Sequence, residues 1–170
     1  YADCDPLTAD VATLCEVACA NKLGVDGQWS QDRDDWLNLI FSEVVQPQLG
    51  HPAPLIVTHY PANQSALARV SPEDARPAER YELFIQGVEL ANGYHELLEA
   101  EELMARNQTV AAQRAGDGKS PLPAGSQLVS AMRSGLPACS GCALGLDRLV
   151  MVASNARLID DVIAFPIERA

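Results

Sequence analysis

Apolar residues recur at helical spacing in two segments near the N-terminus. In the first segment, between the candidate N-cap Thr8 and Gly24, these positions are Val11, Leu14, Cys15 and Ala18. In the second, which follows Ser30 and closes at Pro47, they are Trp36, Leu37, Ile40, Phe41 and Val44. Both patterns predict amphipathic helices, because residues spaced about 3.6 positions apart share one helix face.

Short β-branched runs farther along the chain predict strands. The run 55–59 is bounded by prolines, which favours a short strand. The stretch "RYELFIQGVELANGYHE" at 80–96 predicts a hairpin that turns at Gln86-Gly87. Between these two, residues 62–79 are expected to form a loop, because Pro72 and Pro77 exclude a long helix.

The remaining elements alternate between helix and strand patterns. Helices are expected at 98–115, 126–134 and 146–154, a long loop at 116–125, and short strands at 140–145 and from Val162 to Phe165. Hairpin strands together with separate helices predict an α+β fold, an antiparallel sheet flanked by helices, within one domain.

The hairpin carries an unusual number of carboxylates. A turn at Gln86-Gly87 pairs residue 85 with 88, 84 with 89, 83 with 90, and 82 with 91. Glu82 and Glu89 then become diagonal neighbours, about 7 Å apart at the backbone. The opposite face is wholly apolar and consists of Leu83, Ile85, Val88 and Leu90. We expect this apolar face to be the buried one.

The expected carboxylate pair lacks a neutralising partner nearby in the sequence. No Lys or Arg lies within residues 81–105. The carboxylate face is therefore either open to water or binds a cation. A Mg²⁺ site fits the second alternative, because Mg²⁺ accepts hard oxygen ligands and leaves room for waters and phosphates. Asn92 and Glu96 flank Gly93, which can bend the strand, and would suit an amine or amino-acid ligand.

Small residues occupy every second position of the strand at 140–145. Gly141, Ala143 and Gly145 leave one face of that strand nearly without side chains. The face either permits close packing, with Asp147 as a helix cap, or receives a flat group such as an adenine ring. In the second alternative Arg148 holds a triphosphate, because its planar guanidinium matches phosphate oxygens. The apolar positions that follow, Leu149, Val150 and Val152, are expected to be buried.

Composition narrows the classes of function. The 170 residues include 12 basic and 23 acidic ones, a net charge of −11, which opposes nucleic-acid binding. No apolar run approaches the roughly 18 residues of a membrane span. No G-x-S-x-G or Walker loop occurs. Without a basic, apolar leader or a starting Met, the N-terminus is expected to be a processed or cloned edge.

The cysteines indicate a reducing compartment. Five of them in a chain of this size suggest free thiols and hence the cytoplasm. A four-thiolate zinc site is the alternative; it would combine Cys15 and Cys19 with Cys139 and Cys142.

Two segments resemble class II aminoacyl-tRNA synthetases of the lysyl branch. "GCALGLDRLVM" is similar to their motif 3, which places that motif at 140–151, and "ERYELFIQGVELANGYHEL" is similar to the preceding strand pair. Over nearly the whole chain, the likeness extends to short paralogues of this branch that attach lysine, preferably its β-isomer, to elongation factor P. The resemblance implies ATP-dependent activation of lysine or β-lysine and its transfer to a lysine of that factor.

Carried over by position, the resemblance also implies roles for individual residues. Glu82 and Glu89 would hold Mg²⁺ and ATP, Gly145 would line the nucleotide site, and Arg148 would contact the γ-phosphate as the catalytic residue. Asn92 and Glu96 would bind the amino acid. Ala143 stands where ordinary lysyl-tRNA synthetases carry Gly, which is expected to reshape the amino-acid pocket.

The family's motifs 1 and 2 are not recognisable in residues 1–170, which we interpret as the C-terminal part of a catalytic domain. The parent enzyme is expected to be a homodimer, with tRNA an unlikely partner. The isolated chain is expected to be inactive. A true lysyl-tRNA synthetase and a non-catalytic nucleotide- or partner-binding module are the alternatives.

Overall fold

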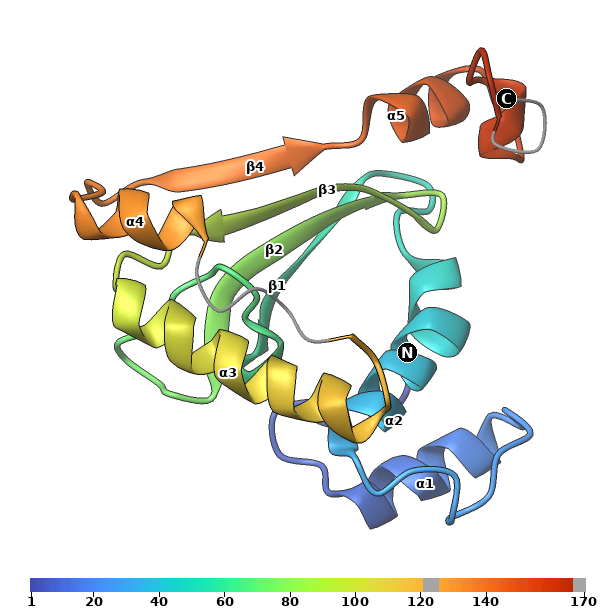
Figure 1. Cartoon of the computed structure of the whole chain (residues 1–170). Helices are drawn as coiled ribbons and strands as arrows, with labels where there is room; N and C mark the ends of the chain where they lie inside the picture. Colours follow the sequence, from blue (N-terminus) through green and yellow to red (C-terminus); the bar gives the residue numbers. More distant parts are fainter. Residues whose placement is uncertain (121–125, 167–170) are drawn as a thin grey trace.

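The computed structural model describes residues 1–120 and 126–166, and at its centre lies an antiparallel sheet with the strand order β1-β2-β3-β4 (Figure 1). The strands are β1 (Leu55–Pro61), β2 (Pro77–Ile85), β3 (Val88–His95) and β4 (Ser140–Leu144). The α-helices are α1 (Val11–Ala20), α2 (Arg33–Ile40), α3 (Ala100–Gly116), α4 (Gln127–Arg133) and α5 (Leu146–Ala153). The predicted α+β fold is confirmed. The loop expected at 116–125 lies partly outside the described residues.

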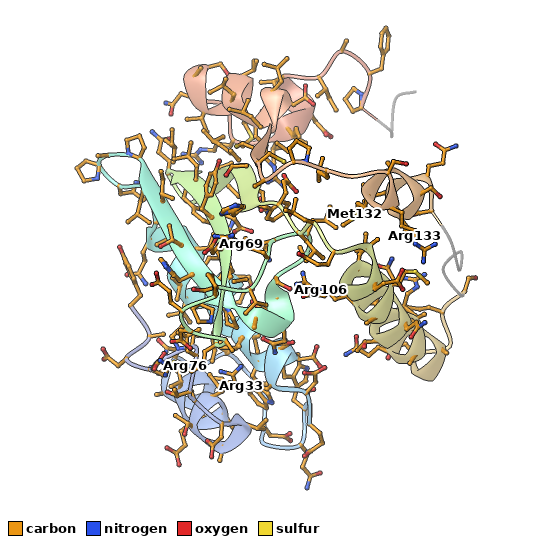
Figure 2. All side chains as sticks on the ribbon, turned by 90° about the vertical axis from the view of Figure 1, so that its left-hand side faces the viewer. Arg33, Arg69, Arg76, Arg106, Met132 and Arg133 are labelled. Carbon is orange, nitrogen blue, oxygen red and sulfur yellow. The ribbon has the colours of Figure 1, made fainter. Side chains whose placement is uncertain are left out.

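The N-terminal helices form a small core of their own. Buried residues of this core are Ala9, Leu14, Ala18, Trp36, Leu37 and Ile40. Asp10 caps α1 by accepting a hydrogen bond from the Thr13 amide at 2.9 Å, so α1 begins later than the predicted cap at Thr8 implies. Arg33, at the start of α2, donates to the Ala9 carbonyl at 2.6 Å and ties the two helices together (Figure 2).

The end of α2 widens into a π-helix, Phe41–Val45, and closes with a 3₁₀ turn, Gln46–Gln48. This continuation brings an aromatic side chain onto the sheet. The ring of Phe41 lies 5.8 Å from that of Phe84 and 6.2 Å from that of Tyr60. Phe84 is fully buried as a result. The second predicted helix therefore exists and covers one face of the sheet.

The register of the hairpin differs from the prediction because β3 contains a β-bulge. Phe84 pairs with Glu89 as expected, but beyond the bulge Leu83 pairs with Ala91 and Glu82 with Asn92. The expected pairs 83–90 and 82–91 are wrong, because one extra residue of β3 fits into the ladder. The burial prediction is also wrong for most of the apolar face: only Leu90 is buried, whereas Leu83, Ile85 and Val88 are half-buried. The π-helix packs instead on the face that carries the carboxylate of Glu82.

The C-terminal third is less densely packed. Helices α3 and α4 enclose a second cluster, Leu97, Ala100, Leu103, Val129 and Met132. Arg106 of α3 donates to the carbonyls of Ala66 and Ala68 at 2.9 and 2.8 Å, which fastens that helix to the loop before β2 (Figure 2). The predicted burial of α5 is wrong, since Leu149 and Val150 are 37% and 44% exposed. Among the described residues, no helix is long and apolar enough to cross a membrane.

The strand expected at Val162–Phe165 is not formed. This segment follows a 3₁₀ turn, Ile159–Asp161, and pairs with no strand of the sheet. A short apolar run does not itself specify a partner strand, and without one its backbone groups gain no ladder hydrogen bonds.

Candidate active site

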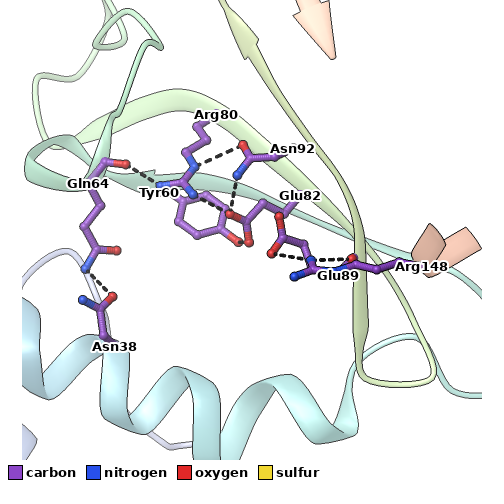
Figure 3. Close-up of polar contacts among 8 residues, drawn as sticks. All are labelled: Asn38, Tyr60, Gln64, Arg80, Glu82, Glu89, Asn92 and Arg148. Atoms are coloured by element: carbon purple, nitrogen blue, oxygen red, sulfur yellow. Dashed lines mark hydrogen bonds and ion pairs between the residues drawn. The ribbon is translucent and has the colours of Figure 1, made fainter. Parts of the chain in front are cut away.

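Glu82 lies at the centre of a buried polar network on the covered face of the sheet (Figure 3). Its Oε1 accepts hydrogen bonds from Arg80 Nη2 at 2.5 Å and from Asn92 Nδ2 at 2.9 Å. Its Oε2 accepts a hydrogen bond from the Tyr60 hydroxyl at 2.5 Å. The residue is only 6% exposed. A carboxylate this deeply buried needs charged and polar partners, and the network supplies them.

Arg80 is the residue that the sequence analysis missed. It precedes Glu82 by two positions in β2, so both side chains project from the same face of the strand. The guanidinium also donates to the Gln64 carbonyl at 2.6 Å and lies 4.6 Å from the centre of the Tyr60 ring. The two-residue period of the strand could have identified it, because Arg80 lies directly before the range 81–105, which contains no Lys or Arg.

Tyr60 completes the network from β1. Burial, together with the hydrogen bond to Glu82 and its negative charge, raises the pKa of Tyr60 far above its ordinary value. The phenol therefore stays protonated near neutral pH and donates a hydrogen bond to Glu82.

Glu89 and Arg148 meet across a long stretch of sequence. Arg148 Nη1 lies 3.3 Å from Glu89 Oε2 and donates to the Glu89 carbonyl at 2.9 Å (Figure 3). Their side chains are 31% exposed for Glu89 and 48% exposed for Arg148. Arg148 is the third residue of α5, whose N-cap is Gly145. Glu82, Glu89 and Arg148, which were predicted to bind ATP, thus lie near one another. Each carboxylate also has a cationic partner, Arg80 for Glu82 and Arg148 for Glu89, although none was found nearby in the sequence.

Glu82 and Glu89 share one large cavity of about 900 Å³ between the sheet and the N-terminal helices. Its polar end includes Tyr60, Arg80 and both carboxylates. Its apolar wall comes mainly from α2, the π-helix and β1, through Leu37, Ile40, Phe41, Val45, Leu55 and Val57. The cavity therefore combines a polar, charged end with an apolar wall.

The carboxylate oxygens at the polar end of the larger cavity are suitable ligands for a hard divalent cation. Glu82 Oε2 carries a single hydrogen bond, from Tyr60, and Glu89 is solvent-accessible. Both can therefore present oxygen to Mg²⁺, with waters or phosphate oxygens completing its coordination. Within residues 1–120 and 126–166, no group of three or more His, Cys, Asp or Glu side chains could hold a metal, so the four-thiolate zinc alternative has no support.

A second, smaller cavity of about 290 Å³ lies over one face of the paired strands β3 and β4. It is lined by Leu67, Asn92, Tyr94, Glu96, Gly141, Cys142 and Ala143. Pairing of Asn92 with Ala143 and of Tyr94 with Gly141 directs these four residues to one face. Asn92 also donates to Glu82, so it connects the two cavities. The three residues predicted to bind an amino acid, Asn92, Glu96 and Ala143, therefore share one cavity.

Comparison with known proteins identifies the family. The model for class II tRNA synthetases (D, K and N) matches residues 40–169. The chain belongs to this family.

Curated relatives carry a more specific name. The chain is 45% identical over its 170 residues to a protein named elongation factor P–(R)-β-lysine ligase from Klebsiella pneumoniae subsp. pneumoniae. It is also 45% identical, over the same 170 residues, to the protein of that name from Yersinia enterocolitica serotype O:8 / biotype 1B. The alignments cover 100% of this chain and 52% of each relative, so the chain spans about half the length of the curated relatives it matches.

Proposed function

We propose that the protein containing this chain activates lysine or β-lysine with ATP and transfers the acyl group to a lysine of elongation factor P. The substrate carboxylate would attack the α-phosphorus of ATP and release pyrophosphate, which leaves an aminoacyl-adenylate. The acceptor amine would then attack the acyl carbon and release AMP. The observation that carries this proposal is the pair of adjoining cavities, one lined by Glu82 and Glu89 and the other by Glu96.

The polar end of the larger cavity would hold the nucleotide. Glu82 and Glu89 would bind Mg²⁺, which offsets negative charge on the phosphates when bound. Arg148 would contact the γ-phosphate, and Gly145 beside it would line the nucleotide site. The pair formed by Arg148 and Glu89 is partly exposed, so exchanging it for a phosphate contact costs little. Arg80 and Tyr60 would keep Glu82 oriented.

The smaller cavity would hold the amino acid. The Glu96 carboxylate would pair with a substrate ammonium group, and Asn92 would hydrogen-bond to the same substrate. Ala143 would narrow the cavity relative to the glycine implied for ordinary lysyl-tRNA synthetases. The catalysis is positioning and charge neutralisation, and it requires no side-chain nucleophile.

The remaining expectations belong to the same proposal. The net charge of −11 suits a protein acceptor better than tRNA. We propose a cytoplasmic homodimer for the complete protein. The 170-residue chain alone is expected to be inactive, because no arginine of motif 2 is recognisable in it to stabilise the adenylation transition state.

Amino-acid-dependent ATP–pyrophosphate exchange by the complete protein tests this proposal. α-Lysine and β-lysine are compared in parallel, followed by transfer of labelled amino acid to elongation factor P or to tRNA. The expected result is exchange with at least one isomer and labelling of the protein acceptor. Glu96→Gln should abolish the exchange that depends on the amino acid, while the enzyme still binds ATP.

Two results would overturn the proposal. Labelling of tRNA in place of elongation factor P would identify a true lysyl-tRNA synthetase. Absence of exchange with both isomers, in a folded sample that binds ATP, would identify a non-catalytic nucleotide-binding module.

A further inference from the structure

Gly141 and Glu96 compete for one small volume in the smaller cavity. A Cβ atom built on Gly141 would lie 2.2 Å from Glu96 Oε1 and 3.4 Å from its Cδ. The first distance is far inside van der Waals contact. The backbone of Gly141 does not have the positive φ that favours glycine, so its conformation suits any L-residue. Gly141 is therefore glycine for reasons of space and not of conformation.

Packing of β4 does not explain the glycine either. Within the described sheet β4 pairs with β3 alone, and most of its residues are exposed. Ala143, two positions along on the same face, already carries a Cβ. That face of the strand therefore accepts a methyl group where Asn92 is the neighbour, but has no room for one where the Glu96 carboxylate lies.

The Glu96 carboxylate lacks a partner among the described residues. Glu96 is half-buried and follows the end of β3, where its amide donates to the Cys139 carbonyl at 3.0 Å. No side chain or amide within residues 1–120 and 126–166 donates to its carboxylate or forms an ion pair with it, in contrast to Glu82 and Glu89. A half-buried carboxylate beside Leu67 and Tyr94 attracts a cationic group of a ligand.

We infer that Gly141 is a specificity-determining residue: the side chain that it lacks leaves the space in which the Glu96 carboxylate faces the cavity. The cavity therefore selects amino acids that carry a second ammonium group on the side chain, because the α-ammonium group alone does not distinguish one amino acid from another. This inference rests on the proposed function, since it takes an amino acid as the ligand of this cavity. Any larger residue at position 141 turns the carboxylate away and removes the selectivity.

The experiment combines Gly141→Ala, Glu96→Gln and the double variant. Calorimetric titration with lysine, β-lysine and norleucine, which lacks the side-chain ammonium, measures affinity for each ligand. Gly141→Ala should weaken binding of the matching lysine isomer by about tenfold to a hundredfold, the loss of one charge-assisted hydrogen bond, and leave norleucine nearly unaffected. Ser140→Thr adds its methyl group on the opposite face of β4 and should bind like the wild type.

Non-additivity is the decisive readout. If Gly141 acts through Glu96, the Gly141→Ala substitution has little further effect in a protein that already carries Glu96→Gln, because the charge is already lost. Equal losses with and without Glu96→Gln would overturn the inference. So would equal weakening of lysine and norleucine binding, which would indicate a general distortion of β4.

A crystal structure of the Gly141→Ala variant separates the inference from the proposed function. The expected result is an unchanged β4 with the Glu96 carboxylate rotated out of the cavity, because the clash involves the far end of a flexible side chain. A shifted β4 with Glu96 in place would overturn the inference. If Glu96 rotates as expected but the wild type binds neither lysine isomer, the spatial role of Gly141 stands and the proposed substrate is wrong.

Discussion

The hairpin β2–β3 and the segment β4–α5 both contribute to the candidate site, but they are held in place to very different degrees. On the hairpin, Phe84 is fully buried and Glu82 is 6% exposed, with hydrogen bonds from Arg80, Tyr60 and Asn92. On β4–α5, Leu144 and Leu146 are 51% and 67% exposed. Arg148 connects to the hairpin through a partly exposed pair with Glu89.

This difference indicates that one half of the site is preorganised by contacts within the chain and the other half is not. A buried, hydrogen-bonded network keeps its members in one arrangement. An exposed helix with few buried apolar contacts opens locally at low free-energy cost. The carboxylate end is therefore the more firmly held part of the site, and Arg148 is held by fewer contacts. The following predictions test this contrast, from the largest expected effect to the smallest.

Removal of the Phe84 ring should show the contrast most strongly. Phe84→Ala is expected to lower the free energy of unfolding by about 4 kcal/mol, because it leaves a cavity beneath Phe41. Leu149→Ala on α5 should cost less than about 1 kcal/mol, since Leu149 is 37% exposed. Urea unfolding of both variants measures the difference, and similar losses would mean that the two regions are equally well packed.

The two arginines offer the same comparison for ion pairs. Arg80→Met is expected to destabilise the fold by about 3 kcal/mol, because Glu82 would keep its buried charge without a cation. Arg148→Met should cost less than about 1 kcal/mol, because its pair with Glu89 is exposed. Arg80→Lys keeps the positive charge but loses the planar set of guanidinium N–H donors, so it should recover part of the lost stability. Denaturant titrations that rank Arg148 above Arg80 would contradict the assignment of the rigid half.

Two glycines test the contrast through added volume. At Gly93 a Cβ would lie 2.2 Å from Cζ of Tyr81, whose ring crosses that position of β3. Gly93→Ala should therefore destabilise by about 2 kcal/mol, as overpacking does. Gly141→Ala should cost less than about 1 kcal/mol, because only the tip of Glu96 has to move. Thermal unfolding of the two variants checks the order, and a larger loss at Gly141 would reverse it.

Acid sensitivity should give the smallest effect. The hydrogen bond from Arg69 lowers the pKa of Glu79 below its ordinary value of 4.5. A depressed pKa in the folded state contributes stability above the unfolded-state pKa, and this contribution is lost as the pH falls through the folded-state value. Glu79→Gln should thus flatten the loss of stability below about pH 4.5. The exposed Glu43, changed to Gln, provides the matched control, and urea midpoints between neutral and acid pH measure both.

Much of the secondary structure could be predicted from local pattern. The stripe that includes Trp36 and Ile40 identified α2, and Gln86-Gly87 identified the hairpin turn. These signals are local, because a helix face or a two-residue turn is defined by residues near one another in sequence. The strand expected at Val162–Phe165 failed because a strand depends on a distant partner.

Register and burial of the hairpin could not be predicted in the same way. The sequence does not indicate that β3 takes up an extra residue after Glu89, and that bulge places Asn92 opposite Glu82. Nor does the all-apolar composition of one face reveal which face the π-helix will cover. Phe41 settles this question by packing on Phe84.

The residue types of the candidate site were visible in the sequence: three carboxylates, Glu82, Glu89 and Glu96, and the guanidinium of Arg148. Their chemical differences were not. Tertiary structure buries Glu82 among three donors, pairs Glu89 with a distant arginine, and leaves Glu96 facing a cavity beside Gly141. The sequence alone determines which groups can ionise. Only the folded chain decides which charges are buried, paired or available to a ligand, because those properties depend on residues brought together from distant parts of the sequence.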